Sequence, residues 1–241
     1  MQVLFEKPIK VELEGTRVFV NNEPHRMSVR KLSELRGVLR GYVIPEATGD
    51  PDIYYMFRNV YEKDGIRFDI TIIPPRVIEG ECAKTYGHNH PPAEEGLSYP
   101  EVYQVLGGTA VFLLQQANRD RSVNVSLIRA MAGDVVLIPA NMAHVTINPG
   151  GDTLVLANIV ADGFESDYSD FRKNRGAAFY YLPDGNIEQN ANYIVRDLER
   201  PMPQQFNRRY GFACGSLLEE LERDPRKFAF LKKPSLLFRR Q

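Results

Sequence analysis

The fold of this chain is decided by the stretch from Thr85 to Gly108, which reads TYGHNHPPAEEGLSYPEVYQVLGG. Within it, His88 and His90 stand two residues apart, and residues i and i+2 of an extended strand point to the same face. His144 ends a second segment, PANMAH, so three of the four histidines fall into two short segments. Glu101 adds a carboxylate oxygen a little downstream of His90. Imidazole and carboxylate together suit a divalent first-row metal, so these four residues predict one metal site.

Composition restricts the class of protein. The chain has 241 residues and a net charge of −1, so no general field draws it to nucleic acid or to a membrane surface. Its sequence contains no apolar run of membrane-spanning length, and residues 1–10 lack the apolar core of a signal peptide. Cys82 and Cys214 form neither a disulfide framework nor a CxxC pair. We therefore expect a cytoplasmic protein that binds neither nucleic acid nor membrane.

Short apolar runs separated by turn residues predict an all-β protein. The runs cover residues 52–61, 65–74, 103–106, 110–115, 123–129, 134–138, 144–148 and 153–159. Many short strands at near-even spacing are typical of a sandwich or a barrel. Ahead of them, residues 10–21 alternate around Glu14-Gly15 and predict a hairpin, and Ser28 predicts the start of a short helix that ends at Leu35.

The C-terminal part of the chain differs from the rest. From about Ile187 the strand pattern fades, and Ser216 predicts the start of a helix over Leu217 to Arg223. Residues 226–240 interleave basic and apolar side chains, which is compatible with a basic arm for anions or a partner. We favour an arm whose apolar residues pack on the protein's own domain or on a second subunit. The chain is thus interpreted as a domain over residues 1–185 followed by a C-terminal extension over residues 186–241.

The spacings in the central segments resemble the two halves of the cupin signature, G-x5-H-x-H-x(3,4)-E-x6-G and G-x5-P-x-G-x2-H-x3-N. Glu101 precedes Gly108 by seven positions, and Gly133, Pro139, His144 and Asn148 follow the second pattern. Cys82 and Asn141 stand where the signature has glycine. The resemblance implies a jelly-roll-like cupin β-barrel, with the N-terminal hairpin and helix and a partly helical C-terminal arm attached to it.

The gap between His90 and the glutamate is longer than the signature allows, which leaves a choice of ligand. Glu94 and Glu95 stand at the usual cupin spacing from His90, but they lie between Pro91-Pro92 and Gly96 in what resembles an inserted loop. Glu101 begins a strand-like segment with six residues before Gly108. We favour Glu101 as the ligand and interpret the two other glutamates as solvated loop charges.

Within the cupins, the chain resembles the metal-dependent, cupin-type glucose-6-phosphate isomerases over roughly residues 10 to 185. The resemblance is carried by Arg30–Ser33, Thr71, Thr85–His90, Glu101–Tyr103, Leu113–Gln115, Ala143-His144, Ala161-Asp162 and Asp167-Tyr168. It implies a homodimer that interconverts glucose 6-phosphate and fructose 6-phosphate with one divalent metal per subunit, Fe²⁺ first among the candidates and then Mn²⁺, Ni²⁺ or Zn²⁺.

The same resemblance implies a role for each site residue. His88, His90, Glu101 and His144 would bind the metal, with catalytic roles for Glu101, Tyr103 and His144. Thr71, Thr85, Gly87, Tyr103 and Tyr168 would bind the sugar phosphate, since hydroxyl groups and a glycine amide are apt donors for phosphate oxygens.

Some residues depart from the family pattern at positions that would shape the sugar pocket, and two alternative functions therefore remain. Ile159 stands in place of a tyrosine, Glu165-Ser166 in place of a histidine, and Asn141 in place of an aromatic residue near the last ligand. Three histidines and one glutamate around iron would also serve a cupin dioxygenase, because a fold does not determine a function. A metal-containing sugar-binding protein without catalytic activity is the other alternative.

Overall fold

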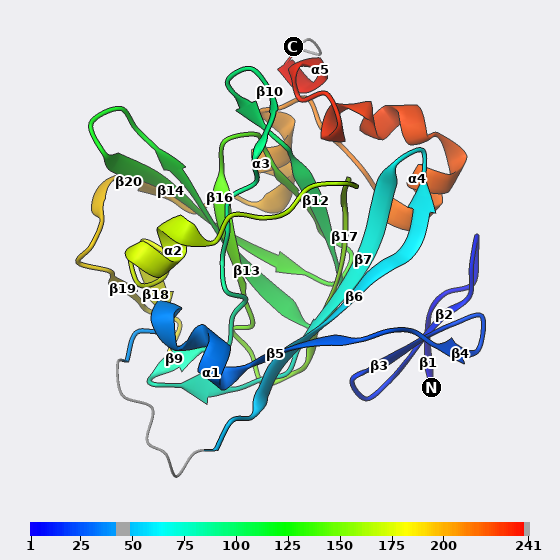
Figure 1. Ribbon diagram of the computed structural model, residues 1–241, viewed down its shortest axis with the longest axis horizontal. Helices are drawn as coiled ribbons and strands as arrows, with labels where there is room; N and C mark the ends of the chain where they lie inside the picture. Colours follow the sequence, from blue (N-terminus) through cyan, green and yellow to red (C-terminus); the bar gives the residue numbers. More distant parts are fainter. Residues whose placement is uncertain (42–48, 239–241) are drawn as a thin grey trace.

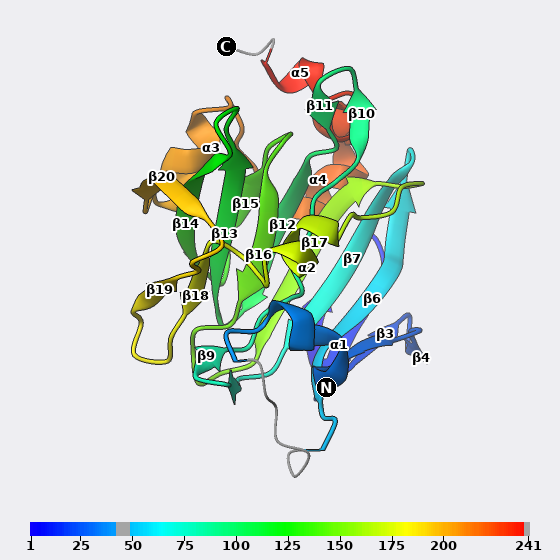
Figure 2. The ribbon, with the colours of Figure 1, turned by 60° about the vertical axis from the view of Figure 1, so that its left-hand side comes forward.

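Two facing β-sheets form the centre of the computed structural model, which describes residues 1–41 and 49–238 (Figure 1). The larger sheet has the strand order β15-β12-β17-β7-β6-β5 and the smaller one β16-β13-β14-β20. In chain order these strands are β5 (Ser28–Lys31), β6 (Asp52–Lys63), β7 (Ile66–Ile73), β12 (Glu101–Gly107), β13 (Thr109–Ala117), β14 (Ser122–Met131), β15 (Val135–Ile138), β16 (Ala143–Ile147), β17 (Leu154–Ala161) and β20 (Ile194–Glu199). Figure 2 shows β13 and β14 facing β6, β7 and β17 across the interior. The predicted all-β cupin jelly roll is confirmed by this arrangement.

The central strands β12 and β17 of the larger sheet are buried on both faces, which explains their nearly continuous apolar sequences. In β12, Tyr103 and Val105 pack in the core between the two sheets, whereas Val102 packs on the opposite face. The side chains of the neighbouring strand β17 alternate between the same two faces, because successive side chains of a strand point to opposite sides. Polar side chains that interrupt the inner face therefore stand out as candidates for function.

The outer face of the larger sheet is covered by both ends of the chain (Figure 1). At the N-terminus, β1 (Gln2–Phe5), β2 (Val11–Glu14), β3 (Arg17–Val20) and β4 (Glu23–Pro24) form a small sheet, whose β2–β3 pair confirms the predicted hairpin. At the C-terminus, the covering elements are α4 (Leu217–Arg223), η3 (Pro225–Leu231) and α5 (Ser235–Phe238), whereas α3 (Pro203–Arg208) lies at the edge strand β15, where the Asn207 side chain hydrogen-bonds with Val135 and Leu137. Phe228, Phe230 and Leu231 are completely buried there. The C-terminal helices thus pack on their own domain; Arg239 and Arg240 lie outside the described residues.

Helix α4 begins at the predicted residue but is held differently from the prediction. It covers Leu217–Arg223 after Ser216, whose hydroxyl makes no capping hydrogen bond. Instead, the Leu217 amide donates to Oε1 of Gln104, at 3.0 Å, from the outer face of β12. The first turn of this helix is therefore fastened directly to the sheet that it covers.

The predicted helix over Val29 to Leu35, with Ser28 as its cap, is wrong in its first three residues. Residues 28–31 form β5, which pairs with β6 through Ser28 and Met56, and only Leu32–Leu35 form the helix α1. The amide of Lys31 donates to the Glu34 carboxylate at 2.8 Å, so the helix begins after Lys31. By pairing with β6 at the edge of the sheet, residues 28–31 satisfy their backbone hydrogen-bonding groups. One further turn of helix would be only marginally stable and would leave those groups to water.

The smaller sheet includes one strand, β20, that lies beyond residue 185 in the sequence. β20 pairs in parallel with β14, and its residues, none of which is fully buried, lack the apolar alternation that would have revealed a strand. The remaining elements are short: η1 (Arg36–Val38), α2 (Ser169–Lys173), and the pairs β8 (Val77–Ile78) with β9 (Glu81–Cys82), β10 (Pro92–Glu94) with β11 (Leu97–Ser98), and β18 (Phe179–Tyr181) with β19 (Ile187–Gln189). None of the helices within residues 1–41 and 49–238 is long and apolar enough to cross a membrane. The division into a domain and an extension at residue 185 stays a prediction.

Candidate metal centre

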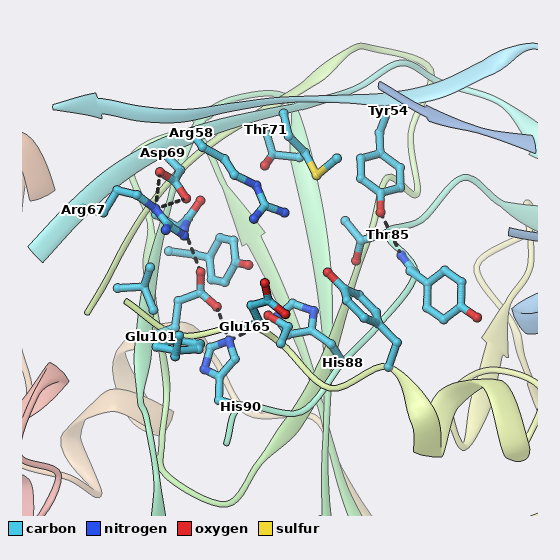
Figure 3. Close-up of a pocket in the computed structure, with 18 residues that line it drawn as sticks. Tyr54, Arg58, Arg67, Asp69, Thr71, Thr85, His88, His90, Glu101 and Glu165 are labelled. Atoms are coloured by element: carbon cyan, nitrogen blue, oxygen red, sulfur yellow. Dashed lines mark hydrogen bonds and ion pairs between the residues drawn. The ribbon is translucent and has the colours of Figure 1, made fainter. Parts of the chain in front are cut away.

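A cavity of about 410 Å³ opens on the inner face of the larger sheet (Figure 3). Four strands of that sheet contribute polar side chains to its wall: Tyr54 and Arg58 from β6, Arg67, Asp69 and Thr71 from β7, Glu101 and Tyr103 from β12, and Asn158 from β17. The opposite side is formed by the segment from Thr85 to His90 and by the loop from Phe164 to Tyr168. Every metal-binding or sugar-binding residue predicted from the sequence, apart from Gly87 and His144, lines this cavity.

Backbone pairing brings two of the histidines together. His88 and His144 are direct cross-strand partners, and each amide donates to the other carbonyl at 3.1 Å. Their rings are 4.3 Å apart, and His90 lies on the same side of its strand as His88, at a ring distance of 5.0 Å. The alternation predicted for His88 and His90 therefore places both imidazoles beside the ring that arrives from β16.

The fourth member of the group is Glu101. One potential ligand atom from each of His88, His90, Glu101 and His144 lies within 4.8 Å of the other three. Oε2 of Glu101 is 3.2 Å from Nε2 of His144 and 3.4 Å from Nε2 of His90. The side chains of Glu101, His90 and His144 are only 4%, 5% and 2% exposed, so this group can bind a metal away from water.

Unsatisfied polar atoms at the centre of this group indicate that a bound cation fits there. Oε2 of Glu101 and Nε2 of His144 are buried and have no hydrogen-bond partner within the described part of the chain. Buried polar atoms are seldom left in this state, because the lost hydration is costly. Nδ1 of His90 contacts the Tyr99 carbonyl at 2.9 Å, and if it carries the proton, Nε2 presents its lone pair to the centre of the group.

The surroundings also shift the pKa values of His88, His90 and Glu101 toward the protonation states that a metal requires. Burial lowers the pKa of His88 well below its usual value, and it lowers the pKa of His90 to about 4 although Glu101 acts in the opposite direction. For Glu101, burial favours the protonated form, but the contact with His144 and the charge of His90 outweigh it and the pKa is lower than usual. Neutral imidazoles and an ionised carboxylate are the forms that bind metal ions.

The structure separates Glu101 from the two alternative glutamates. Glu94 lies on β10, where its carboxylate accepts hydrogen bonds from the Ser235 amide at 2.7 Å and from the Ser235 hydroxyl at 3.1 Å. Glu95 is exposed in the turn that follows. Only Glu101 of these three belongs to the histidine group, as its strand-like sequence context had indicated.

Of the residues predicted to bind phosphate, Thr71 and Thr85 line the cavity, whereas Gly87 does not. Thr71 is on β7, and the Thr85 hydroxyl oxygen accepts the Thr146 amide at 3.0 Å, which leaves the hydroxyl proton available to a ligand. Gly87 has φ +81°, and a Cβ atom there would overlap the Phe171 ring. Tyr168 contacts both the Tyr86 ring at 5.3 Å and the His88 ring at 5.7 Å. Tyr103 is buried beside Glu101, and burial and that carboxylate raise its pKa well above the usual value.

Several cavity residues were not identified from the sequence. Asn158 donates to Oε1 of Glu101 at 2.7 Å, and Arg67 forms an ion pair with Asp69 at 2.9 Å. Arg58 is exposed, and its guanidinium points into the cavity (Figure 3). A signal existed for Asp69, because it stands two residues before Thr71 on the same strand and thus shares its face.

Of the positions that depart from the family pattern, one lines the cavity and two lie outside it. Ile159 packs on the outer face of the sheet, so Asn158 and Val160 are the residues of this strand that reach the cavity. Glu165 lines the cavity beside His88 (Figure 3). Asn141 has φ +65°, a left-handed conformation that glycine and asparagine tolerate, and its Oδ1 accepts the Ser98 amide at 2.9 Å. Asparagine at the glycine position of the signature therefore also binds β11.

A family model described as glucose-6-phosphate isomerase (GPI) matches residues 29–196, which is more than half of the chain. The chain belongs to the glucose-6-phosphate isomerase family. It is similar to the glucose-6-phosphate isomerase of Thermococcus litoralis, with 26% identity over 202 residues that cover 80% of this chain and 96% of the relative. The Pyrococcus furiosus glucose-6-phosphate isomerase is 28% identical over 170 residues, covering 68% of this chain and 85% of the relative.

Family membership accounts for the barrel and the ligand-bearing segments but not for the whole chain. The C-terminal helices lie beyond the matched residues, although they cover one face of the larger sheet. A solved structure of an oxalate decarboxylase aligns with a TM-score of 0.36 and 20% identity over 48% of this chain and 28% of that one. So slight a likeness carries no argument about activity.

Proposed function

We propose that this protein interconverts glucose 6-phosphate and fructose 6-phosphate, with one divalent metal held by His88, His90, Glu101 and His144. The observation that carries the proposal is the buried group of three imidazoles and one carboxylate, with unsatisfied atoms at its centre, in a chain of the glucose-6-phosphate isomerase family. When bound, a divalent ion polarises a sugar carbonyl as a Lewis acid and stabilises negative charge on the neighbouring oxygens. Fe²⁺ is the first candidate, followed by Mn²⁺, Ni²⁺ and Zn²⁺.

The protein's own groups would supply proton transfer and orientation. Isomerisation moves a hydrogen between C1 and C2 of the open-chain sugar, and an ionised Glu101 is the carboxylate that would take the proton from one carbon and return it to the other. The hydrogen bond from Asn158 fixes Oε1 of that carboxylate. Tyr103 keeps its proton because its pKa is raised, so its hydroxyl would donate to a sugar oxygen or to Glu101. His144, whose Nε2 lies 3.2 Å from Oε2 of Glu101, would help to orient this carboxylate.

The far end of the cavity would hold the phosphate. Thr71, Thr85 and the Gly87 amide would provide neutral donors for its oxygens. Arg58 adds a positive charge to the cavity wall, which favours an anionic sugar over a neutral one. Tyr168 would pack against the sugar. A cytoplasmic homodimer is part of the proposal and is supported by the family resemblance alone.

A coupled assay of fructose 6-phosphate conversion to glucose 6-phosphate tests this function. The protein would be stripped with EDTA and reloaded separately with Fe²⁺, Mn²⁺, Ni²⁺ and Zn²⁺. We expect turnover to return with at least one metal and to be absent with unphosphorylated fructose. Folded, metal-loaded protein without turnover would contradict the proposal, and oxygen uptake by the iron form would point instead to a dioxygenase.

A further inference from the structure

An inserted hairpin, residues 91–100, connects two of the proposed metal ligands. It contains β10 and β11, it follows His90 directly, and it leads directly into Glu101. Figures 1 and 2 both show α5, at the C-terminus, beside this hairpin. The contact consists of Glu94, whose two carboxylate oxygens accept the amide and the hydroxyl of Ser235, at 2.7 and 3.1 Å. The hairpin is thus held from outside the barrel by the C-terminal helices.

The other side of the hairpin contacts the histidine group. The Tyr99 carbonyl contacts Nδ1 of His90 at 2.9 Å, and the Tyr99 ring stacks on Phe164 at 4.4 Å. Phe164 in turn packs on the His90 ring at 4.8 Å. Any displacement of the hairpin would therefore change which nitrogen of His90 carries the proton and how the ring is oriented, since both depend on the partner of Nδ1.

The C-terminal helices offer a firm attachment for the hairpin. Leu231 and Leu237, on either side of Ser235, are completely buried against the outer face of the larger sheet. Nζ of Lys232 donates to the Asp64 carbonyl at 2.6 Å, which ties the same segment to the turn between β6 and β7. Ser235 is therefore part of a packed layer rather than of a free chain end.

We propose that the C-terminal helices position the metal site, by holding the inserted hairpin through the Glu94–Ser235 contact and thereby fixing His90 and its Nδ1 partner. Glu94 acts here as a positioning residue that touches neither metal nor substrate. The inference rests on the proposed metal site. It assigns a role to the residues after 196, which the family match does not reach.

Amide hydrogen exchange in the metal-free protein tests the positioning directly. The reporters are the Tyr99 amide, which donates to the Pro91 carbonyl at 3.1 Å, and the Ser98 amide, which donates to Asn141. Glu94→Ala should accelerate exchange at both amides about tenfold, because a charge-assisted contact that opposes local opening is lost. Glu95→Ala is the matched control, since Glu95 is exposed in the same hairpin. Its exchange should equal that of the wild type.

Metal affinity provides the second measurement, with Co²⁺ as a spectroscopic probe in competition with a chelator. Outer groups that orient a metal ligand are worth about 10- to 100-fold in affinity, so Glu94→Ala should weaken Co²⁺ binding by about tenfold. Ser235→Ala, which keeps the amide contact, should have a smaller effect in the same direction. A chain that ends at Pro234 should match Glu94→Ala; if it is poorly folded, the two point variants still decide the question.

Each outcome separates the positioning role from the alternatives. Unchanged exchange in metal-free Glu94→Ala overturns the proposal. Weaker Co²⁺ binding without faster exchange also overturns it, because that result would make Glu94 a ligand. Neither measurement requires turnover, so an inactive wild-type protein would contradict the proposed isomerase activity and leave the test of positioning intact.

Discussion

Nδ2 of Asn158 lies 2.7 Å from Oε1 of Glu101, and this hydrogen bond joins two neighbouring strands inside the barrel. Asn158 is opposite Tyr103 in the β12–β17 register, so it is the diagonal neighbour of Glu101 on the inner face. The bond engages one carboxylate oxygen and leaves Oε2 directed at His90 and His144. The strand register thereby orients the carboxylate toward the histidines.

The first prediction concerns this hydrogen bond. Asn158→Ala should weaken metal binding about tenfold and lower kcat with little change in KM, because the carboxylate loses its orientation but the phosphate contacts remain. Metal titration and steady-state kinetics measure the two effects. Asn124→Ala, an asparagine variant on β14 outside the cavity, should leave both quantities unchanged. Equal losses in the two variants would contradict an orienting role.

A second prediction concerns the histidine group. His144→Ala should lose the bound metal and roughly 10³-fold in kcat, because Lewis-acid stabilisation is worth several kcal/mol. Metal content by elemental analysis checks the first result and the coupled assay checks the second. His25→Ala removes the one histidine outside the group and should retain both metal and activity. Full metal content in His144→Ala would show that the metal binds elsewhere.

Phosphate recognition gives a third prediction. Thr71→Val should raise KM for fructose 6-phosphate about 10- to 100-fold with a nearly constant kcat, since a hydrogen bond to a charged group contributes roughly 1.5–3 kcal/mol in both ground and transition state. Steady-state kinetics provides the measurement, and inorganic phosphate as a competitive inhibitor provides the control. The variant should bind inorganic phosphate correspondingly less tightly. An unchanged inhibition constant would exclude Thr71 from the phosphate site.

The backbone at Gly87 allows a fourth prediction about stability. Gly87→Ala combines a positive φ with an overlap on the Phe171 ring, so the free energy of unfolding should fall by about 2–4 kcal/mol. Urea unfolding measures the change. Gly133→Ala is the matched control, because its φ is +94° but nothing lies within 4 Å of the added Cβ. This control should cost about 1 kcal/mol, from backbone strain alone.

Acidification should destabilise the metal-free protein. The pKa of His90 is about 4 when folded, against 6.5 as the ordinary value, so between those pH values the unfolded chain binds more protons than the folded one. Stability should therefore rise with pH across this window, by about 3 kcal/mol for a shift of roughly 2.5 units, and His88 acts in the same direction. Urea unfolding between pH 4 and 7 measures this slope. His90→Gln should reduce this slope and leave the contribution of His88, and an equal slope in that variant would contradict the assignment.

Much of this arrangement could be predicted from residues alone, because the signals are local. Period-two spacing places His88 and His90 on one face, and short apolar runs predict the strands of both sheets. The helix predicted over residues 29–35 was wrong in its first three residues because Ser28 to Lys31 satisfy their backbone groups by pairing with β6, a partner that no local pattern reveals. β20 was missed for the opposite reason, since its side chains, none of which is fully buried, carry no apolar alternation.

The order and spacing of residues along the chain were enough to predict the cupin fold, the histidines and carboxylate of the candidate metal site, and the family. The packed fold was needed to show that Glu94 contacts Ser235 and not the metal group, that Asn158 orients Glu101, and that Ile159 points away from the cavity. These relationships join residues 57 to 141 positions apart or depend on strand register. They arise when the sheets and the C-terminal helices pack, and no local pattern encodes them.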